Sequence, residues 1–250
     1  MGGELCVTYR IHLDNWTEKE FAVKLDPDTL SLIQQVPPAP APWAALGNRK
    51  CKSCTLDESA NPYCPVAVNL QELMEFLKDM VSYDEADVTV ETNERRYFKR
   101  TTFQTTASSI MGIIMVTSGC PVLDRMRPMV ETHLPFSTLD ETIYRFVTMY
   151  LFGQYFIYKK GGVPDWDMER LVEFFETVEE VNTSFCRRLD TMRNEDSSVN
   201  GVSILSCMST MTKFAITDND MEHWEKIYLA YYGAAPGGGL NHIDLPPAAI

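Results

Sequence analysis

Residues 5–13 read LCVTYRIHL, and this stretch decides the N-terminal part of the fold. Every second residue from Val7 to Leu13 is apolar, which is the period of a strand with one buried face. The segment FAVKL at residues 21–25 alternates in the same way. Two alternating segments joined by a short polar connection predict a β-hairpin over residues 5–25.

A second pair of short alternating segments lies further along the chain. Residues 88–90 and 97–99 flank the turn-forming residues 92–94, and this arrangement predicts a second hairpin. Both hairpins have free strand edges, so we expect them to pair in one small antiparallel sheet.

Most of the remaining chain has helical periodicity, with apolar residues three and four positions apart. Thr138 and Glu141 have the spacing of a capping box, and Gly161 is the expected end of the same helix. The expected helices cover residues 69–81, 103–117, a short segment that begins at Pro121, 138–160, 165–192, 198–214 and 218–232.

These elements predict an α+β fold, in which the sheet of two hairpins packs on a mainly helical C-terminal bundle. We expect a single domain over residues 4–232, with a loop at 36–65 that is rich in proline and carries cysteines. Residues 233–250 contain a run of glycines and a pair of prolines, which predicts a flexible tail.

Charge and hydrophobicity exclude some classes of protein. The chain has 250 residues, with 35 Asp and Glu against 22 Lys and Arg, so its formal net charge is −13. A general duplex-DNA binder needs many basic groups, so this class is not expected. No signal peptide or membrane-spanning run is seen, and we expect a soluble cytoplasmic protein without membrane contact.

The cysteines are the strongest indication of a site. Cys51 and Cys54 form a C-x2-C knuckle, Cys64 follows closely, and Cys120 lies far along the chain. Such a knuckle lets two thiolates bind one ion, and a tetrahedral zinc site needs four ligands. We therefore predict a structural zinc site made by these four cysteines, with His133 as second choice for the fourth ligand. An iron–sulfur cluster is one alternative, and reduced thiols packed in a loop are another.

The region 118–154 gives an enzymatic alternative. Cys120 precedes an expected helix, whose dipole would activate it as a nucleophile, and His133 would be the base. A small anionic substrate or ligand would then be bound by Arg145 and Gln154. The simpler interpretation is that Glu141 and Arg145, four residues apart on one helix, pair with each other, and that His133 is a hydrogen-bonding loop residue.

Two charged segments point to possible partners. Residues 95–100 read RRYFKR, and stacking rings combined with positive charge are typical of single-stranded nucleic-acid binding. Strand alternation divides this cluster between two faces, so a solvated hairpin edge is the preferred interpretation. Residues 165–180 are strongly acidic, which indicates a solvated helix face or a surface for a basic protein partner.

Several short motifs occur in a fixed order along the chain. They are C-x2-C at 51–54, CP at 64–65, SGCP at 118–121, HLPF at 133–136, ET-x-x-R at 141–145 and QYF at 154–156. This series resembles an uncharacterised family of bacterial proteins of unknown function. The resemblance implies a bacterial cytosolic protein and no particular activity. One departure is Thr55, where the resemblance leads us to expect a proline after the second cysteine.

Our leading expectation from the sequence is thus a cytosolic binding or regulatory protein that is stabilised by a cysteine-bound metal. The enzymatic use of Cys120 and His133 and nucleic-acid binding by the 95–100 hairpin remain alternatives. No sequence feature indicates the oligomeric state.

Overall fold

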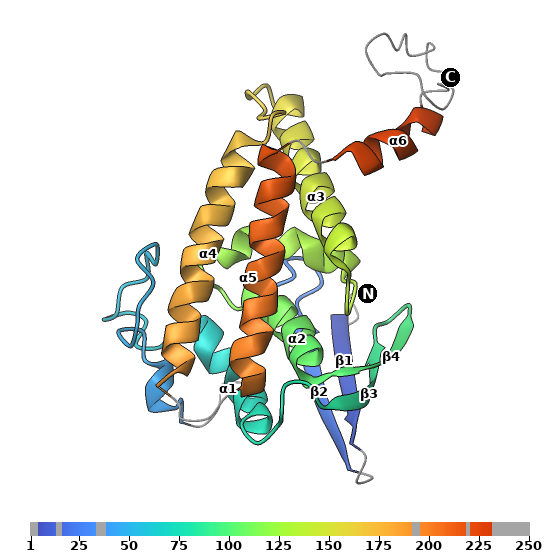
Figure 1. Cartoon of the computed structure of the whole chain (residues 1–250). Helices are drawn as coiled ribbons and strands as arrows, with labels where there is room; N and C mark the ends of the chain where they lie inside the picture. Colours follow the sequence, from blue (N-terminus) through green and yellow to red (C-terminus); the bar gives the residue numbers. More distant parts are fainter. Residues whose placement is uncertain (1–4, 14–16, 34–38, 192–195, 219–220, 232–250) are drawn as a thin grey trace.

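The computed structural model describes residues 5–13, 17–33, 39–191, 196–218 and 221–231 (Figure 1). The predicted α+β architecture is confirmed: a four-stranded antiparallel sheet accompanies a larger set of helices. The predicted flexible tail at 233–250 lies outside the described residues.

The sheet contains both predicted hairpins, in the order β2-β1-β3-β4. In β1, Tyr9 lies opposite Phe21 on one side and Val90 on the other, so the apolar faces of three strands are in register. Alternation places this face against the helices and leaves the polar face in solvent. The strands are β1 (Leu5–His12), β2 (Glu18–Leu25), β3 (Glu85–Glu91) and β4 (Arg96–Thr102).

Helix α2 packs against the sheet, and the helices pack mainly against one another. In Figure 1, α2 lies next to the sheet, while α3, α4 and α5 rise away from it. The helical elements are η1 (Pro42–Ala44), α1 (Pro65–Leu77), α2 (Phe103–Thr117), η2 (Leu123–Thr132), α3 (Leu139–Lys159), α4 (Glu169–Leu189), α5 (Asp196–Thr217) and α6 (Glu222–Tyr231).

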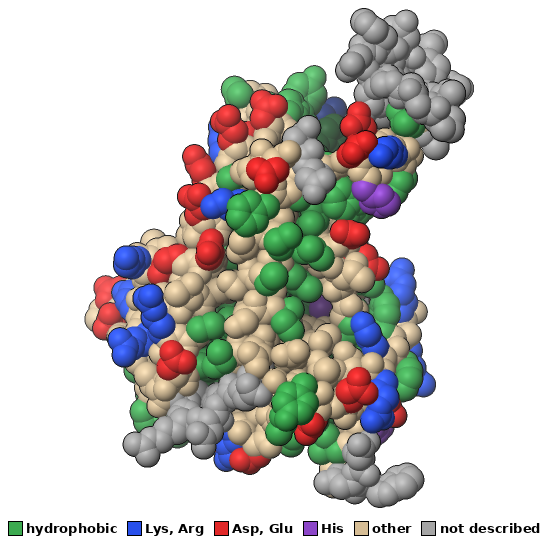
Figure 2. Space-filling model, in the orientation of Figure 1, with side chains coloured by type: hydrophobic (Ala, Val, Ile, Leu, Met, Phe, Trp, Pro, Cys, Tyr) green, Lys and Arg blue, Asp and Glu red, His purple; other side chains and the backbone are tan. Residues whose placement is uncertain are grey.

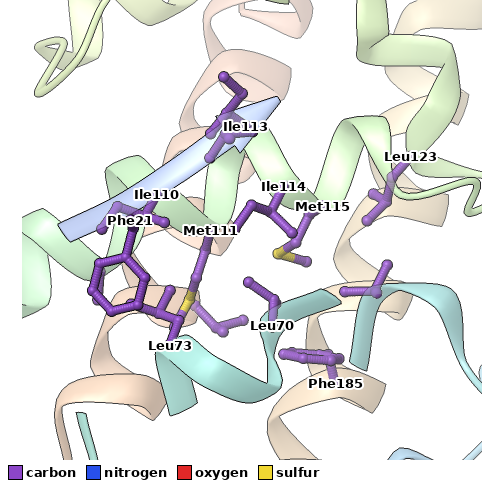
Figure 3. Packing of buried hydrophobic residues seen from close by; sticks show 14 of the residues in the cluster. Phe21, Leu70, Leu73, Ile110, Met111, Ile113, Ile114, Met115, Leu123 and Phe185 are labelled. Carbon is purple, nitrogen blue, oxygen red and sulfur yellow. The ribbon is translucent and has the colours of Figure 1, made fainter. Parts of the chain in front are cut away.

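One cluster of buried side chains joins the sheet to the helices. Figure 3 shows α2 at its centre, where Met111 points toward Leu73 of α1 and Phe21 of β2. The same cluster reaches Phe185 of α4. Because α2 contacts both layers, its residues are apolar around most of the circumference.

Several helix boundaries differ from the predicted ones, and three of the helix starts have a physical reason. α1 begins at Pro65, four residues early, because proline fits the first helical position, where no N–H donor is needed. α4 begins at Glu169 rather than 165, since the Asp165 carboxylate accepts the backbone N–H of Arg170 and turns the chain first. Pro121 lies in a turn, and the 3-10 segment η2 follows it.

Two predicted helix ends are confirmed. Thr138 and Glu141 form the full capping box of α3, and Gly161 follows its end with φ +78°. Across the described ranges, no helix combines the length and the hydrophobicity needed to cross a membrane.

Candidate functional site

The four cysteines predicted as ligands line one small pocket. Cys51, Cys54, Cys64 and Cys120 all border the same space of about 30 Å³, although they come from three separate parts of the chain. Each is partly buried, and none forms a disulfide. The structure therefore brings together the residues that the sequence analysis grouped.

Local backbone geometry sets each cysteine in position. The N–H of Cys54 donates to the carbonyl of Cys51 at 3.1 Å, which closes the knuckle into a tight turn. Cys64 is the N-cap residue of α1, and its N–H donates to Ala44 at 2.8 Å. Cys120 follows Gly119, whose φ of +88° lets the chain turn sharply after α2.

The knuckle is fixed to α4 by Glu180. This carboxylate accepts the backbone N–H of Lys52 at 2.9 Å and the hydroxyl of Ser53 at 2.5 Å. Ser184, one turn along α4, donates to the same carboxylate at 2.9 Å. Burial works to raise the pKa of Glu180, but these hydrogen bonds outweigh it and lower the pKa, which favours the ionised form.

The 3-10 segment η1 and the residues that follow it, before the knuckle, are held by Arg188. Its side chain is 2% exposed and donates to the carbonyls of Trp43 and Ala45 at 2.8 and 2.6 Å. Arg188 also lines the cysteine pocket, with its guanidinium directed to these backbone carbonyls. Figure 1 shows the loop (blue to cyan) beside the lower half of α4.

Two of the pocket thiols, Cys51 and Cys120, favour their protonated form because their pKa values are raised. Burial raises the pKa of Cys51 to about 12, and Glu180 and the three neighbouring thiols add to this effect. Burial also raises the pKa of Cys120, although backbone hydrogen bonds from Leu123 and Val122 to its sulfur oppose the rise. As the side chains are placed, no group of three or more His, Cys, Asp or Glu residues in the described ranges could hold a metal ion.

A second site lies among the helices. A cavity of about 150 Å³ is bounded by α2, η2, α3, α4 and α5, and both His133 and Arg145 line it. Nε2 of His133 lies 2.7 Å from the hydroxyl of Tyr9, which is 2.9 Å from Oγ of Ser109. Burial, and after it the charge of Arg145, lowers the pKa of His133 to about 4, so the imidazole is neutral at pH 7.

The other predicted ligand-binding residues are used elsewhere. The carboxylate of Glu141 accepts the N–H of Thr138 at 2.7 Å in the capping box and acts on Arg145 only through its charge. Gln154 is buried and accepts the N–H of Asp165 at 2.8 Å. Gln154 shares only an outer groove with Arg145, not the cavity that holds His133.

The expected catalytic pair is not brought together. Cys120 lines the cysteine pocket and His133 lines the helical cavity. Because His133 does not line the cysteine pocket, Cys120 is the fourth candidate ligand there and His133 is not. The raised pKa of Cys120 is also the opposite of what an activated nucleophile needs.

The basic 95–100 segment lies on β4 at the edge of the sheet. Arg96 pairs with Glu91, and Arg100 lies 3.3 Å from both Glu85 and Asp87. Carboxylates of β3 therefore balance part of the positive charge that the nucleic-acid interpretation needs.

Three residues that support the cysteine pocket and the helical cavity were not predicted from the sequence. Arg188 follows Val181 and Phe185 on the buried face of α4, and a charge at that spacing is a signal of a buried partner. Tyr9 lies on the buried face of β1, where its hydroxyl must find a hydrogen bond. Glu180 carries no such signal, because its position within an acidic segment suggests only a solvated face.

The fold and these two sites define an α+β protein with a four-cysteine pocket and a separate internal cavity. The chain belongs to the family described as Domain of unknown function (DUF6901), which matches residues 7–229. The expectation of an uncharacterised family is confirmed. A search of curated proteins and a search of solved structures each returned no match.

Proposed function

We propose that this protein is a binding or regulatory protein in which Cys51, Cys54, Cys64 and Cys120 hold one zinc ion. The observation that carries the proposal is the convergence of all four thiols on one pocket. Four thiolates are the ligand set of closed, structural zinc sites. In this role the ion ties the loop that precedes α1 to the turn between α2 and η2.

The surroundings of the pocket support thiolate ligands. Four thiolates and one Zn²⁺ together carry a net negative charge. The cationic residue Arg188 lines the same pocket. Cys64 lies at the N-terminus of α1, where the helix dipole favours a negative sulfur. The backbone N–H groups of Leu123 and Val122 donate to the sulfur of Cys120, and such donors stabilise a metal-bound thiolate.

The ligand set favours a single ion over a cluster. Four thiolates are the usual ligands of a closed zinc site, and the cysteine spacing of ferredoxins is absent from this sequence. Ion binding requires the four side chains to rotate inward and lose their protons, which is the usual coupling of metal binding to thiol deprotonation. We also propose a bacterial cytoplasm as the setting, because reducing conditions keep the thiols free for metal.

Metal analysis tests the proposal. The full chain is purified without chelator, and zinc and iron are measured for the wild type, Cys54→Ser and Cys207→Ser. Cys207 is exposed on α5 and serves as the matched control. We expect about one zinc per chain in the wild type and in Cys207→Ser, and a loss of most of it in Cys54→Ser.

Two results would contradict the zinc site. One is wild-type protein that holds no metal after growth and purification with added zinc. The other is Cys54→Ser protein that retains as much zinc as the wild type. A brown protein that contains iron would instead favour the cluster.

A further inference from the structure

The cavity between the helices has a mostly apolar wall. Its volume is about 150 Å³, and apolar side chains from α2, η2, α3 and α5 form most of the lining. Several of them are methionines, whose flexible side chains adapt to the shape of a bound molecule. The methionines are Met115, Met126, Met129 and Met208.

Arg145 brings to this wall a positive charge with no ion-pair partner among the described residues, and the more distant Glu141 offsets it only in part. Nη2 donates to the carbonyl of Met129 at 2.8 Å, but Nε is buried and has no hydrogen-bond partner among the described residues. No carboxylate in the described ranges lies within ion-pair distance of the guanidinium, because Glu141 is used in the capping box. A half-buried cation of this kind is costly to the protein unless an anion accompanies it.

Neutral polar groups complete one side of the cavity. His133, uncharged at pH 7, and Ser109 both line it, and Tyr9 links them through hydrogen bonds of 2.7 and 2.9 Å. This series of hydrogen bonds fixes the imidazole of His133. It adds no negative charge that would compete with a bound anion for Arg145.

We propose that this cavity binds a small carboxylate with an apolar body. The carboxylate pairs with the guanidinium of Arg145, and the apolar part lies among the methionines and Phe146. A cavity of about 150 Å³ lined by apolar side chains is large enough for a benzene ring. The ligand class is therefore an aromatic or short-chain monocarboxylate, and the inference does not depend on the zinc site.

Arg145 also borders space outside the cavity. Arg145 and Met129 line both the cavity and the open groove between η2 and α3. Figure 2 shows hydrophobic side chains running down the middle of the face formed by α3 and α5, with charged ones mainly at its edges. Arg145 is thus shared by the cavity and the open groove.

Benzoate is the probe, and benzamide is its neutral counterpart of the same shape. Binding of each to the full-length wild type is measured by isothermal titration calorimetry at pH 7. We expect one saturable site that prefers benzoate by at least about tenfold, the effect of one charge-assisted pair. This comparison needs no variant and stands even if substitutions impair folding.

Variants then assign the preference to Arg145. In Arg145→Met we expect the preference for benzoate over benzamide to vanish, while thermal stability and zinc content remain. Arg96→Met on β4 removes an exposed arginine as the matched control and leaves benzoate binding unchanged. Equal affinity for benzoate and benzamide, no saturable binding of benzoate, or full benzoate preference in Arg145→Met would each overturn the proposal.

Discussion

His133 is the residue whose protonation most affects the internal cavity. Burial, followed by the charge of Arg145, lowers its pKa from 6.5 to about 4 in the folded protein. Between these values the unfolded chain binds a proton that the folded chain does not, so the free energy of unfolding falls as pH decreases from 6.5 toward 4. Above pH 6.5 both states are neutral and the effect disappears.

We therefore expect the free energy of unfolding to depend on pH through the protonation of His133. A pKa difference of about 2.5 contributes about 3 kcal/mol to the free energy of unfolding when His133 is neutral in both states. About 2 kcal/mol of this contribution is lost between pH 7 and pH 5. Urea unfolding at both pH values should show that His133→Gln loses about 2 kcal/mol less than the wild type over this interval. Equal losses in the two proteins would mean that His133 is not buried in neutral form.

Residue spacing predicted the members of the cysteine pocket but not what holds them. Cys51, Cys54 and Cys64 are close in sequence, so their convergence needs only a turn and a helix start. Glu180 and Arg188 reach the loop from more than a hundred residues away, and no local pattern records such pairing. Long-range hydrogen bonds of this kind become visible only when the helices are packed.

Among the elements, α2 and α5 approach most closely at Gly201. A Cβ there would lie 3.0 Å from Cβ of Ala107 and 3.3 Å from the backbone nitrogen of Ser108. At Gly153 in α3, a Cβ would meet nothing within 4 Å. The two glycines therefore have different physical roles, one in packing and one without a packing function.

Opposite effects are expected at these two positions. Gly201→Leu forces α5 away from α2 and should lower the free energy of unfolding by about 1–3 kcal/mol. Gly153→Ala should raise it by about 0.5–1 kcal/mol, because alanine favours the helix and open space receives its methyl group. Urea denaturation of both variants and the wild type checks this, and a stable Gly201→Leu protein would refute the close packing of α2 on α5.

Element type was predictable wherever a period extended over the whole element. The alternation of β1 and the repeat of α2 predicted both elements, and Phe103–Thr117 matches its expected range. Helix starts were less predictable where side chains compete with the backbone. Asp165 accepts the N–H of Arg170 and delays α4, an effect that periodicity does not contain.

On the scale of the whole molecule, the cysteine loop depends little on the hydrophobic core, against which only Cys51 of the knuckle packs. The main cluster runs from the sheet through α1 and α2 to α4 without the knuckle at its centre. Within the loop at residues 48–62, Glu180 accepts hydrogen bonds from Lys52 and Ser53. Arg188 holds the residues just before the loop through the carbonyls of Trp43 and Ala45. If zinc is bound as proposed, its removal should loosen this loop and leave the helices in place.

Limited trypsin digestion can detect this local loosening. Arg49 and Lys52 are exposed cleavage sites on either side of Cys51. After chelation we expect cleavage there to become at least about fivefold faster, because local opening exposes the backbone, while far-UV circular dichroism keeps its helical signal. Cys54→Ser should be cleaved quickly without chelator, and returning zinc should protect the wild type but not this variant.

An unchanged cleavage rate after complete zinc removal would show that Glu180 and Arg188 hold the loop without metal. Loss of the helical signal would show instead that the ion supports the whole fold.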